Sequence, residues 1–232
     1  NRSTRLLQLL EEKDQIDYER FKTIKYDHQL PTPLSYNYMD LNPLFEMNVD
    51  DYPEVAALLT DIHNWDRVTN VESYGAGAYA ILYYNLTPFY YELPEDRVFT
   101  HKALFEALKV TKSYMITHFK SERVRLGEFQ KLVRGEKELA AFGLPDVVTA
   151  MRGEDYKDGK IKITHGESYI GLVRFTPTKT YYESAISYGS SSRPESPHYS
   201  DQMEMYLDFK TKTMSFDRAD VLDSALDRYA PK

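Results

Sequence analysis

The stretch KIKIT at residues 160–164 decides the fold, because charged and β-branched residues alternate in it. This period of two is typical of a half-solvated β-strand. A turn signal, Asp158-Gly159, precedes the stretch, and two β-rich runs follow it, YIGLVRF at 169–175 and YYESAISY at 181–188. Four residues, TPTK at 176–179, separate these two runs. We therefore expect the three runs to form a three-stranded antiparallel meander.

Upstream of these runs, from residue 1 to about 120, the apolar residues recur mostly at helical spacing. We expect helices to follow the N-cap residues Ser3 or Thr4, Asp17, Ser73 and Thr100. An amphipathic helix is expected to carry Val55, Leu58, Leu59, Ile62 and Trp65 on one face. The proline-rich segment 29–47 predicts an irregular connection with one short helical turn.

The remaining segments complete an α+β assignment. Residues 129–133 read as a short strand. Beyond Pro197 we expect short helices, the last beginning at Asp217 with Val221, Leu222 and Leu226 facing inward. The chain 1–232 is therefore expected to be mainly helical over 1–125, to form antiparallel strands over 126–190 and to end in short helices over 191–232.

Composition excludes several classes of protein. The 232 residues are 42% hydrophobic and 14% aromatic, which is enough apolar surface for a sizeable core. A net charge of −7 without a long Lys/Arg run argues against a nucleic-acid partner. The absence of cysteine excludes disulfides, a thiolate nucleophile and Cys-ligated zinc within this sequence. The most apolar stretch, residues 74–84, is shorter than the ~20 residues of a membrane span, so we expect no membrane anchor.

Few residue patterns in the chain indicate chemistry. The six histidines never form the i, i+4 pair with a nearby carboxylate that makes a helical zinc site. The GSSS string at 189–192 lacks the second glycine of a nucleophile elbow, although His198 and Asp201 follow it. The acidic pairs Asp50-Asp51 and Glu154-Asp155 are interpreted as caps or loops, and Gly75-Ala76-Gly77 as a helix-packing site. These patterns alone describe an α+β unit without a complete active site.

A resemblance adds a functional expectation. The run SSSRPESPHYSDQ at 190–202, and SPHYSDQ within it most specifically, resembles the signature near the C-terminus of the penicillin amidase family. GESY at 166–169, Trp65-Asp66 followed by Ser73, and LGE to LVRG over 126–135 also resemble family segments. One difference is Arg67, which stands where glycine commonly follows the Trp-Asp pair and affects a turn.

The resemblance implies an N-terminal-nucleophile hydrolase with an αββα sandwich, of which this chain would complete a part. In that family the nucleophile is the first residue of the mature β chain, a Ser, Thr or Cys whose α-amino group acts as base. The first residue here is Asn1, which has no hydroxyl or thiol. We therefore expect this chain to be a C-terminal portion of the β chain, that is, a fragment or processed chain without a signal peptide. The nucleophile and the oxyanion donors would lie upstream, so the chain alone should be inactive.

Arg2 is the one catalytic residue that the resemblance suggests. Ungapped, Asn1-Arg2-Ser3-Thr4 matches the helix start at which penicillin acylases carry an arginine that positions the oxyanion asparagine. The planar donor fork of arginine suits this supporting role. Arg5, one turn later, is the competing candidate, and His198 is interpreted as a structural hydrogen-bonding residue.

The expected function is hydrolysis of a linear N-acyl amide bond through an acyl-enzyme. The resemblance implies a hydrolase made as a zymogen, periplasmic or extracellular, of the kind associated with antibiotic metabolism. Its partners would be the upstream part of its own precursor and a small N-acyl substrate, and neither nucleic acid nor membrane. We expect no cofactor or metal in this chain; calcium in the intact enzyme would have its ligands upstream. Unpaired strand edges predict weak self-association of the isolated chain.

A second hypothesis remains open. The chain could be a non-catalytic binding or scaffold module that keeps the acylase fold, because it contains no complete catalytic site. The reading frame upstream of Asn1 distinguishes the two hypotheses, since an acylase should carry a linker, a Ser, Thr or Cys, and an oxyanion asparagine there.

Overall fold

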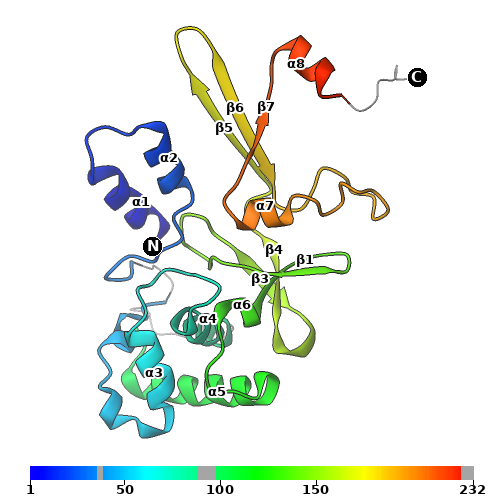
Figure 1. Cartoon of the computed structure of the whole chain (residues 1–232). Helices are drawn as coiled ribbons and strands as arrows, with labels where there is room; N and C mark the ends of the chain where they lie inside the picture. The colour runs from blue at the N-terminus through cyan, green and yellow to red at the C-terminus, as the bar shows by residue number, and fades with distance from the viewer. Residues whose placement is uncertain (36–38, 88–97, 226–232) are drawn as a thin grey trace. The chain divides into compact units, whose positions relative to one another are not determined.

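The computed structural model describes residues 1–35, 39–87 and 98–225, and it divides the chain into two compact units (Figure 1). The first unit comprises residues 1–166 and the second residues 167–232. Helices dominate the first part of the chain and sheets follow, so the expected α+β class is confirmed. The helices of the first unit are α1 (Arg2–Glu11), α2 (Tyr18–Lys25), α3 (Ala56–His63), α4 (Tyr74–Leu86), α5 (His101–Phe119) and α6 (Leu126–Phe129).

Most helix starts agree with the sequence, because an N-cap is a local contact. The side chains of Asp17, Ser73 and Thr100 each accept a hydrogen bond from a first-turn backbone N–H, as predicted. The predicted cap of the first helix is wrong. Helix α1 begins at Arg2, before Ser3 and Thr4, and its N-cap residue is Asn1, whose side chain makes no capping bond. The short turn expected within 29–47 is the 3₁₀ helix η1 (Asn42–Phe45).

Helix α4 is the centre of the first unit and packs against both α3 and α5. Buried side chains of α3, among them Leu58 and Ile62, and of α5, among them Leu104, surround it. The small residues at its start allow close approach, as expected. A Cβ atom on Gly77 would lie 2.0 Å from the carbonyl oxygen of Val124. The segment before α6 therefore lies directly against the α4 backbone.

A four-stranded sheet completes the first unit, with the order β2-β1-β4-β3. Its strands are β1 (Gln130–Arg134), β2 (Lys137–Ala140), β3 (Arg152–Asp155) and β4 (Ile161–His165). The strands predicted at 129–133 and 160–164 correspond to β1 and β4, each within one residue. These two strands pair in parallel, whereas β1–β2 and β3–β4 are antiparallel.

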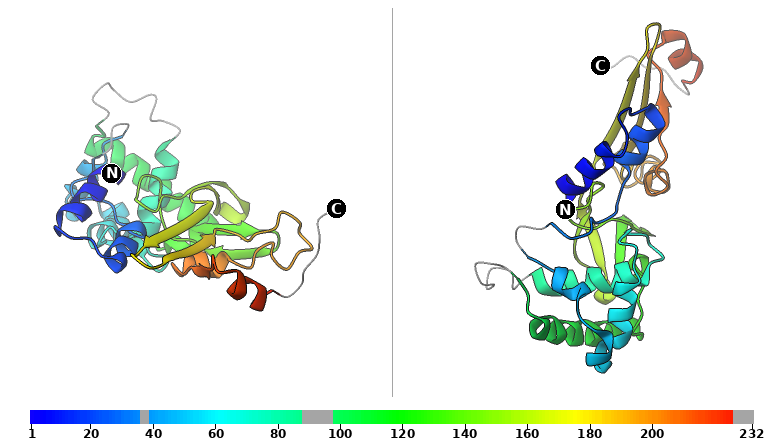
Figure 2. Two further views of the ribbon diagram at one scale, coloured as in Figure 1. Left: turned by 90° about the horizontal axis from the view of Figure 1, so that it is seen from above. Right: turned by 90° about the vertical axis from the view of Figure 1, so that its left-hand side faces the viewer.

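The second unit is built on a long antiparallel hairpin of β5 (Tyr169–Phe175) and β6 (Thr180–Ile186). The short strand β7 (Lys212–Met214) pairs with β6 and lies beside it in the right-hand view of Figure 2. The predicted meander is therefore wrong. Both edges of β4 are occupied by β1 and β3 in the other sheet, so β7 supplies the third strand of the hairpin sheet.

The C-terminal segment contains two short helices, α7 (Met203–Leu207) and α8 (Arg218–Asp223), besides the unexpected strand β7. Asp217 caps α8, as predicted. The expected inward orientation of α8 is wrong for Val221, which is 49% exposed, and Leu226 lies outside the described residues. Across the described part of the chain, no helix combines the length and apolar character needed to cross a membrane.

Candidate functional site

Arg2 lies in the first turn of α1, where a loop of the same unit contacts it. Its Nε donates a hydrogen bond to the carbonyl oxygen of Val147 at 3.1 Å. The Asp146 carboxylate accepts from the Arg2 backbone N–H at 3.4 Å and lies 2.7 Å from the backbone nitrogen of Asn1. Within the described residues, the two Nη groups of the exposed Arg2 have no hydrogen-bond partner. These four N–H bonds are therefore available to an acceptor.

Arg5 has a different environment. Its Nη2 donates to Asp27 Oδ2 at 2.8 Å, and its Nε is 3.2 and 3.3 Å from the two carboxylate oxygens. The two side chains are only 18% and 12% exposed. This bidentate geometry engages Nε and Nη2 of Arg5 with the two carboxylate oxygens of Asp27. Of the two arginines weighed from the sequence, Arg5 is occupied and Arg2 presents free donors.

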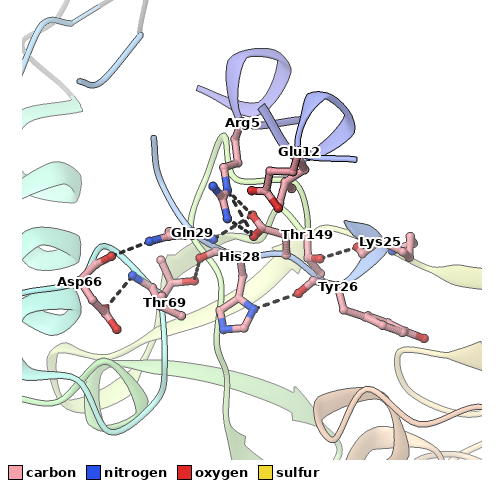
Figure 3. A network of polar contacts seen from close by, with 12 residues as sticks. Arg5, Glu12, Lys25, Tyr26, His28, Gln29, Asp66, Thr69 and Thr149 are labelled. Atoms are coloured by element: carbon pink, nitrogen blue, oxygen red, sulfur yellow. Dashed lines mark hydrogen bonds and ion pairs between the residues drawn. The ribbon is translucent and has the colours of Figure 1, made fainter. Parts of the chain in front are cut away.

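The Arg5–Asp27 pair belongs to a network that joins α1, the end of α2 and two loops (Figure 3). Asp27 also accepts from the backbone N–H of Gln29 at 3.2 Å, and Gln29 Nε2 donates to the carbonyl of Asp66 at 2.8 Å. Thr149 donates from its backbone N–H to the carbonyl of Asp27 and from its hydroxyl to the carbonyl of Lys25, both at 2.9 Å. The loop that contacts Arg2 is thus also fastened to the end of α2.

The Trp-Asp segment forms a turn in which Arg67 has a left-handed backbone, with φ of 64°. Glycine adopts this conformation without steric cost, which explains why the replacement affects a turn. Arg67 Nη1 donates to the carbonyl of Pro31 at 2.7 Å, and its guanidinium lies 4.0 Å from the centre of the Phe45 ring. Burial lowers the pKa of Arg67 from its ordinary value. Arg67 therefore has a packing role here.

The SPHYSDQ motif lies in the second unit, where its contacts are internal. His198 Nδ1 is 2.8 Å from Asp201 Oδ2, and both side chains are substantially exposed. Gln202 is buried, and its Oε1 accepts from the backbone N–H of Ile186 at 3.1 Å. A Cβ on Gly189 would lie 2.2 Å from the carbonyl oxygen of His198. Gln202 fastens the motif to the end of β6, while the exposed His198 ring contacts Asp201 within the motif.

The other patterns from the sequence also have structural positions. Glu154-Asp155, interpreted as a cap or loop, lies in β3, where only the glycine before it is buried. Asp50-Asp51 lies in the 3₁₀ helix η2 (Val49–Asp51). In residues 1–35, 39–87 and 98–225, no three His, Asp or Glu side chains lie close enough together to hold a metal ion.

Sequence reasoning did not identify Asp146, Val147 or Asp27 as contacts of the two arginines. Asp146 is separated from Arg2 by 144 positions, and Asp27 from Arg5 by 22. The Pro145-Asp146 pair signals a turn, but nothing in a single sequence indicates what that turn contacts.

Comparisons with known proteins identify the family. The sequence model of the penicillin amidase family, described as "Penicillin amidase", matches residues 1–223. An acyl-homoserine lactone acylase PvdQ from Pseudomonas fluorescens (strain Pf0-1) is 26% identical over 108 residues, which is 45% of this chain and 14% of that protein.

A solved structure, a thermostable penicillin G acylase from Alcaligenes faecalis, aligns with 98% of this chain and 51% of its own, at 13% identity and a TM-score of 0.47. The chain thus spans much less than the full length of either relative. Because the family model covers nearly all of the sequence, from the helix that carries Arg2 to the SPHYSDQ motif and beyond, the chain belongs to the penicillin amidase family.

Proposed function

We propose that this chain is the C-terminal portion of an acylase that hydrolyses a linear N-acyl amide bond. The family match over residues 1–223 carries this proposal. The substrate is a small N-acyl compound, and the partner of this chain is the upstream part of its own precursor. The working enzyme is a processed zymogen of the periplasm or extracellular space. Calcium, where the intact enzyme holds it, has its ligands upstream.

The reaction proceeds through an acyl-enzyme. A Ser, Thr or Cys at the start of the mature β chain, upstream of the part described here, attacks the acyl carbonyl. Its α-amino group takes the proton and delivers it to the leaving amine. Water then attacks the acyl-enzyme, releases the carboxylic acid and regenerates the nucleophile. An upstream backbone N–H and an asparagine amide stabilise the oxyanion of each tetrahedral intermediate.

Within this chain, Arg2 supports the reaction by positioning the oxyanion asparagine. Two observations favour Arg2 over Arg5. The Nη groups of Arg2 have no partner in the described residues, while Nε is held by Val147. Arg5 instead directs its fork at Asp27. An arginine anchored at Nε presents its two Nη groups in a fixed plane, which suits the carbonyl of an amide side chain.

The experiment compares residues 1–232 alone with the same chain preceded by its upstream segment, on N-acyl amide substrates of differing acyl length. We expect hydrolysis only when the upstream segment is present. The matched control replaces the upstream nucleophile by alanine and should be inactive. Hydrolysis by residues 1–232 alone would contradict the proposed division, and absence of hydrolysis in every combination would favour a scaffold module.

A further inference from the structure

A loop far along the chain, Leu144–Thr149, holds the start of α1. Two of its apolar side chains anchor it in the core, since Leu144 and Val147 are 2% and 0% exposed. The backbone N–H of Met151 closes the loop by donating to the carbonyl of Leu144 at 3.1 Å. Its last residue, Thr149, is hydrogen-bonded to the end of α2. The loop is thus bonded to the end of α2 at Thr149 and held in the core by Leu144 and Val147.

Asp146 directs its carboxylate at the first turn of α1. That turn needs an external acceptor, because the side chain of Asn1 makes no capping bond to the helix and instead accepts from the backbone N–H of Ser35 at 2.6 Å. Asp146 contacts the backbone nitrogens of Asn1 and Arg2. In a longer chain the Asn1 nitrogen is a peptide N–H with one hydrogen for two acceptors, Asp146 and the Ser35 carbonyl, whereas the bond from the Arg2 N–H to Asp146 does not depend on a free amino group.

The next residue of the loop fixes the Arg2 side chain itself. Val147 offers its carbonyl to Nε, which restrains the plane of the guanidinium and leaves the N–H bonds of the two Nη groups unused within the described residues. We propose that Asp146 is a positioning residue, which places the start of α1 so that Val147 orients the Arg2 fork toward the upstream oxyanion asparagine. This inference rests on the proposed function of Arg2 and names the part of the fold that orients it.

The backbone of Asp146 provides an unusually clean test. Its φ is 69°, in the left-handed region that glycine adopts freely and aspartate only at a cost. Asp146→Gly therefore removes the carboxylate while relaxing the backbone. Asp146→Asn tolerates the same φ and keeps one neutral acceptor oxygen. If the residue served only to form the turn, the glycine variant would be as good as the native residue.

The experiment measures kcat and KM for the full-length protein, on the N-acyl substrate that it hydrolyses fastest. The variants are Asp146→Gly, Asp146→Asn, Arg2→Ala and the double variant of Asp146→Gly with Arg2→Ala. We expect Asp146→Gly to lower kcat roughly tenfold with KM little changed, because misplacing a catalytic group slows the transition state selectively. Asp146→Asn should retain more of the native kcat. In the Arg2→Ala background, Asp146→Gly should have no further effect on kcat.

Two results would overturn the inference while leaving the role of Arg2 intact. One is a native kcat for Asp146→Gly when Arg2→Ala lowers it. The other is an equal loss from Asp146→Gly in both backgrounds, which would indicate general damage to the fold. A native kcat for Arg2→Ala would instead reject the proposed role of Arg2 itself, and the positioning inference with it.

Discussion

Arg5 and Asp27 form a bidentate ion pair that connects the first helix to the segment two residues beyond the end of the second, with Nη2 and Oδ2 2.8 Å apart. Asp27 also accepts from the Gln29 backbone N–H and, through its own carbonyl, from Thr149. Asp27 therefore joins α1 through its carboxylate and the 144–149 loop through its main-chain carbonyl. The first prediction concerns this pair.

Asp27→Ala should lower the stability of the protein by about 1–3 kcal/mol, because it leaves a half-buried guanidinium and a backbone N–H without their acceptor. Thermal and urea unfolding measure this change. The control is Glu19→Gln, which breaks the exposed i, i+3 pair with Lys22 and should cost less than about 0.5 kcal/mol. Equal losses in the two variants would show that the Arg5–Asp27 pair has no special structural importance.

Gly77→Ala should destabilise the protein even though alanine favours helices by about 1 kcal/mol over glycine. The added methyl group would lie 2.0 Å from the Val124 carbonyl oxygen and 2.9 Å from the Leu126 nitrogen, so backbone must move. Overpacking of this kind costs roughly 1–3 kcal/mol or more. Ser113→Ala, at an exposed position of α5, is the control and should be neutral or slightly stabilising. A more stable Gly77→Ala variant would mean that α4 and the 124–126 segment are not in contact.

Gln130→Met should cost about 1–3 kcal/mol, since buried carbonyls would lose their donor. The Gln130 side chain is fully buried, and its Nε2 lies 2.8 Å from the carbonyl oxygens of both Phe142 and Gly143. The matched control is Gln29→Met, which removes a single bond to the Asp66 carbonyl at a partly exposed position. Chemical denaturation should show Gln130→Met to be clearly less stable than Gln29→Met. The reverse order would contradict the role of the buried Gln130 amide as a donor to these carbonyls.

Tyr84 should make stability sensitive to alkaline pH. Burial raises the pKa of its phenol, while the hydrogen bond from the Gly153 backbone N–H opposes that shift. Because the pKa is higher in the folded state, the phenol's contribution is fully present below its unfolded pKa of about 10 and is lost as pH rises through the folded pKa.

The measurement is the free energy of unfolding of the native protein and of Tyr84→Phe at pH 8 and pH 10.5. Tyr84→Phe removes the titrating group but also the acceptor of the Gly153 N–H. We expect it to be less stable than the native protein at pH 8 and to lose less stability between the two pH values. Equal losses in the two proteins would contradict the buried position of this phenol.

Features set by neighbouring residues could be predicted from the sequence. The caps at Asp17, Ser73, Thr100 and Asp217 are bonds within three residues, so residue type and spacing suffice to identify them. The alternation at 160–164 likewise identified a strand. The partners of that strand could not be predicted, because pairing depends on contacts distant in sequence.

The missed strands explain the wrong meander. β3 has three exposed residues of four and no β-branched residue, and β7 is only three residues long, so neither carries a periodic signal. The same limit applied at the candidate site. The family resemblance indicated Arg2, but the contacts of Asp146 and Val147 with it come from a loop whose position only the folded chain establishes.

The most direct test of the proposed function is to locate the acyl group during turnover. The full-length protein is mixed with a slowly hydrolysed acyl ester or N-acyl amide, quenched in acid, digested, and analysed by mass spectrometry. We predict one covalent acyl group on a Ser, Thr or Cys that precedes Asn1 in the precursor, and none on residues 1–232. An acyl group on a side chain within residues 1–232 that forms and decays at the catalytic rate would contradict the proposal.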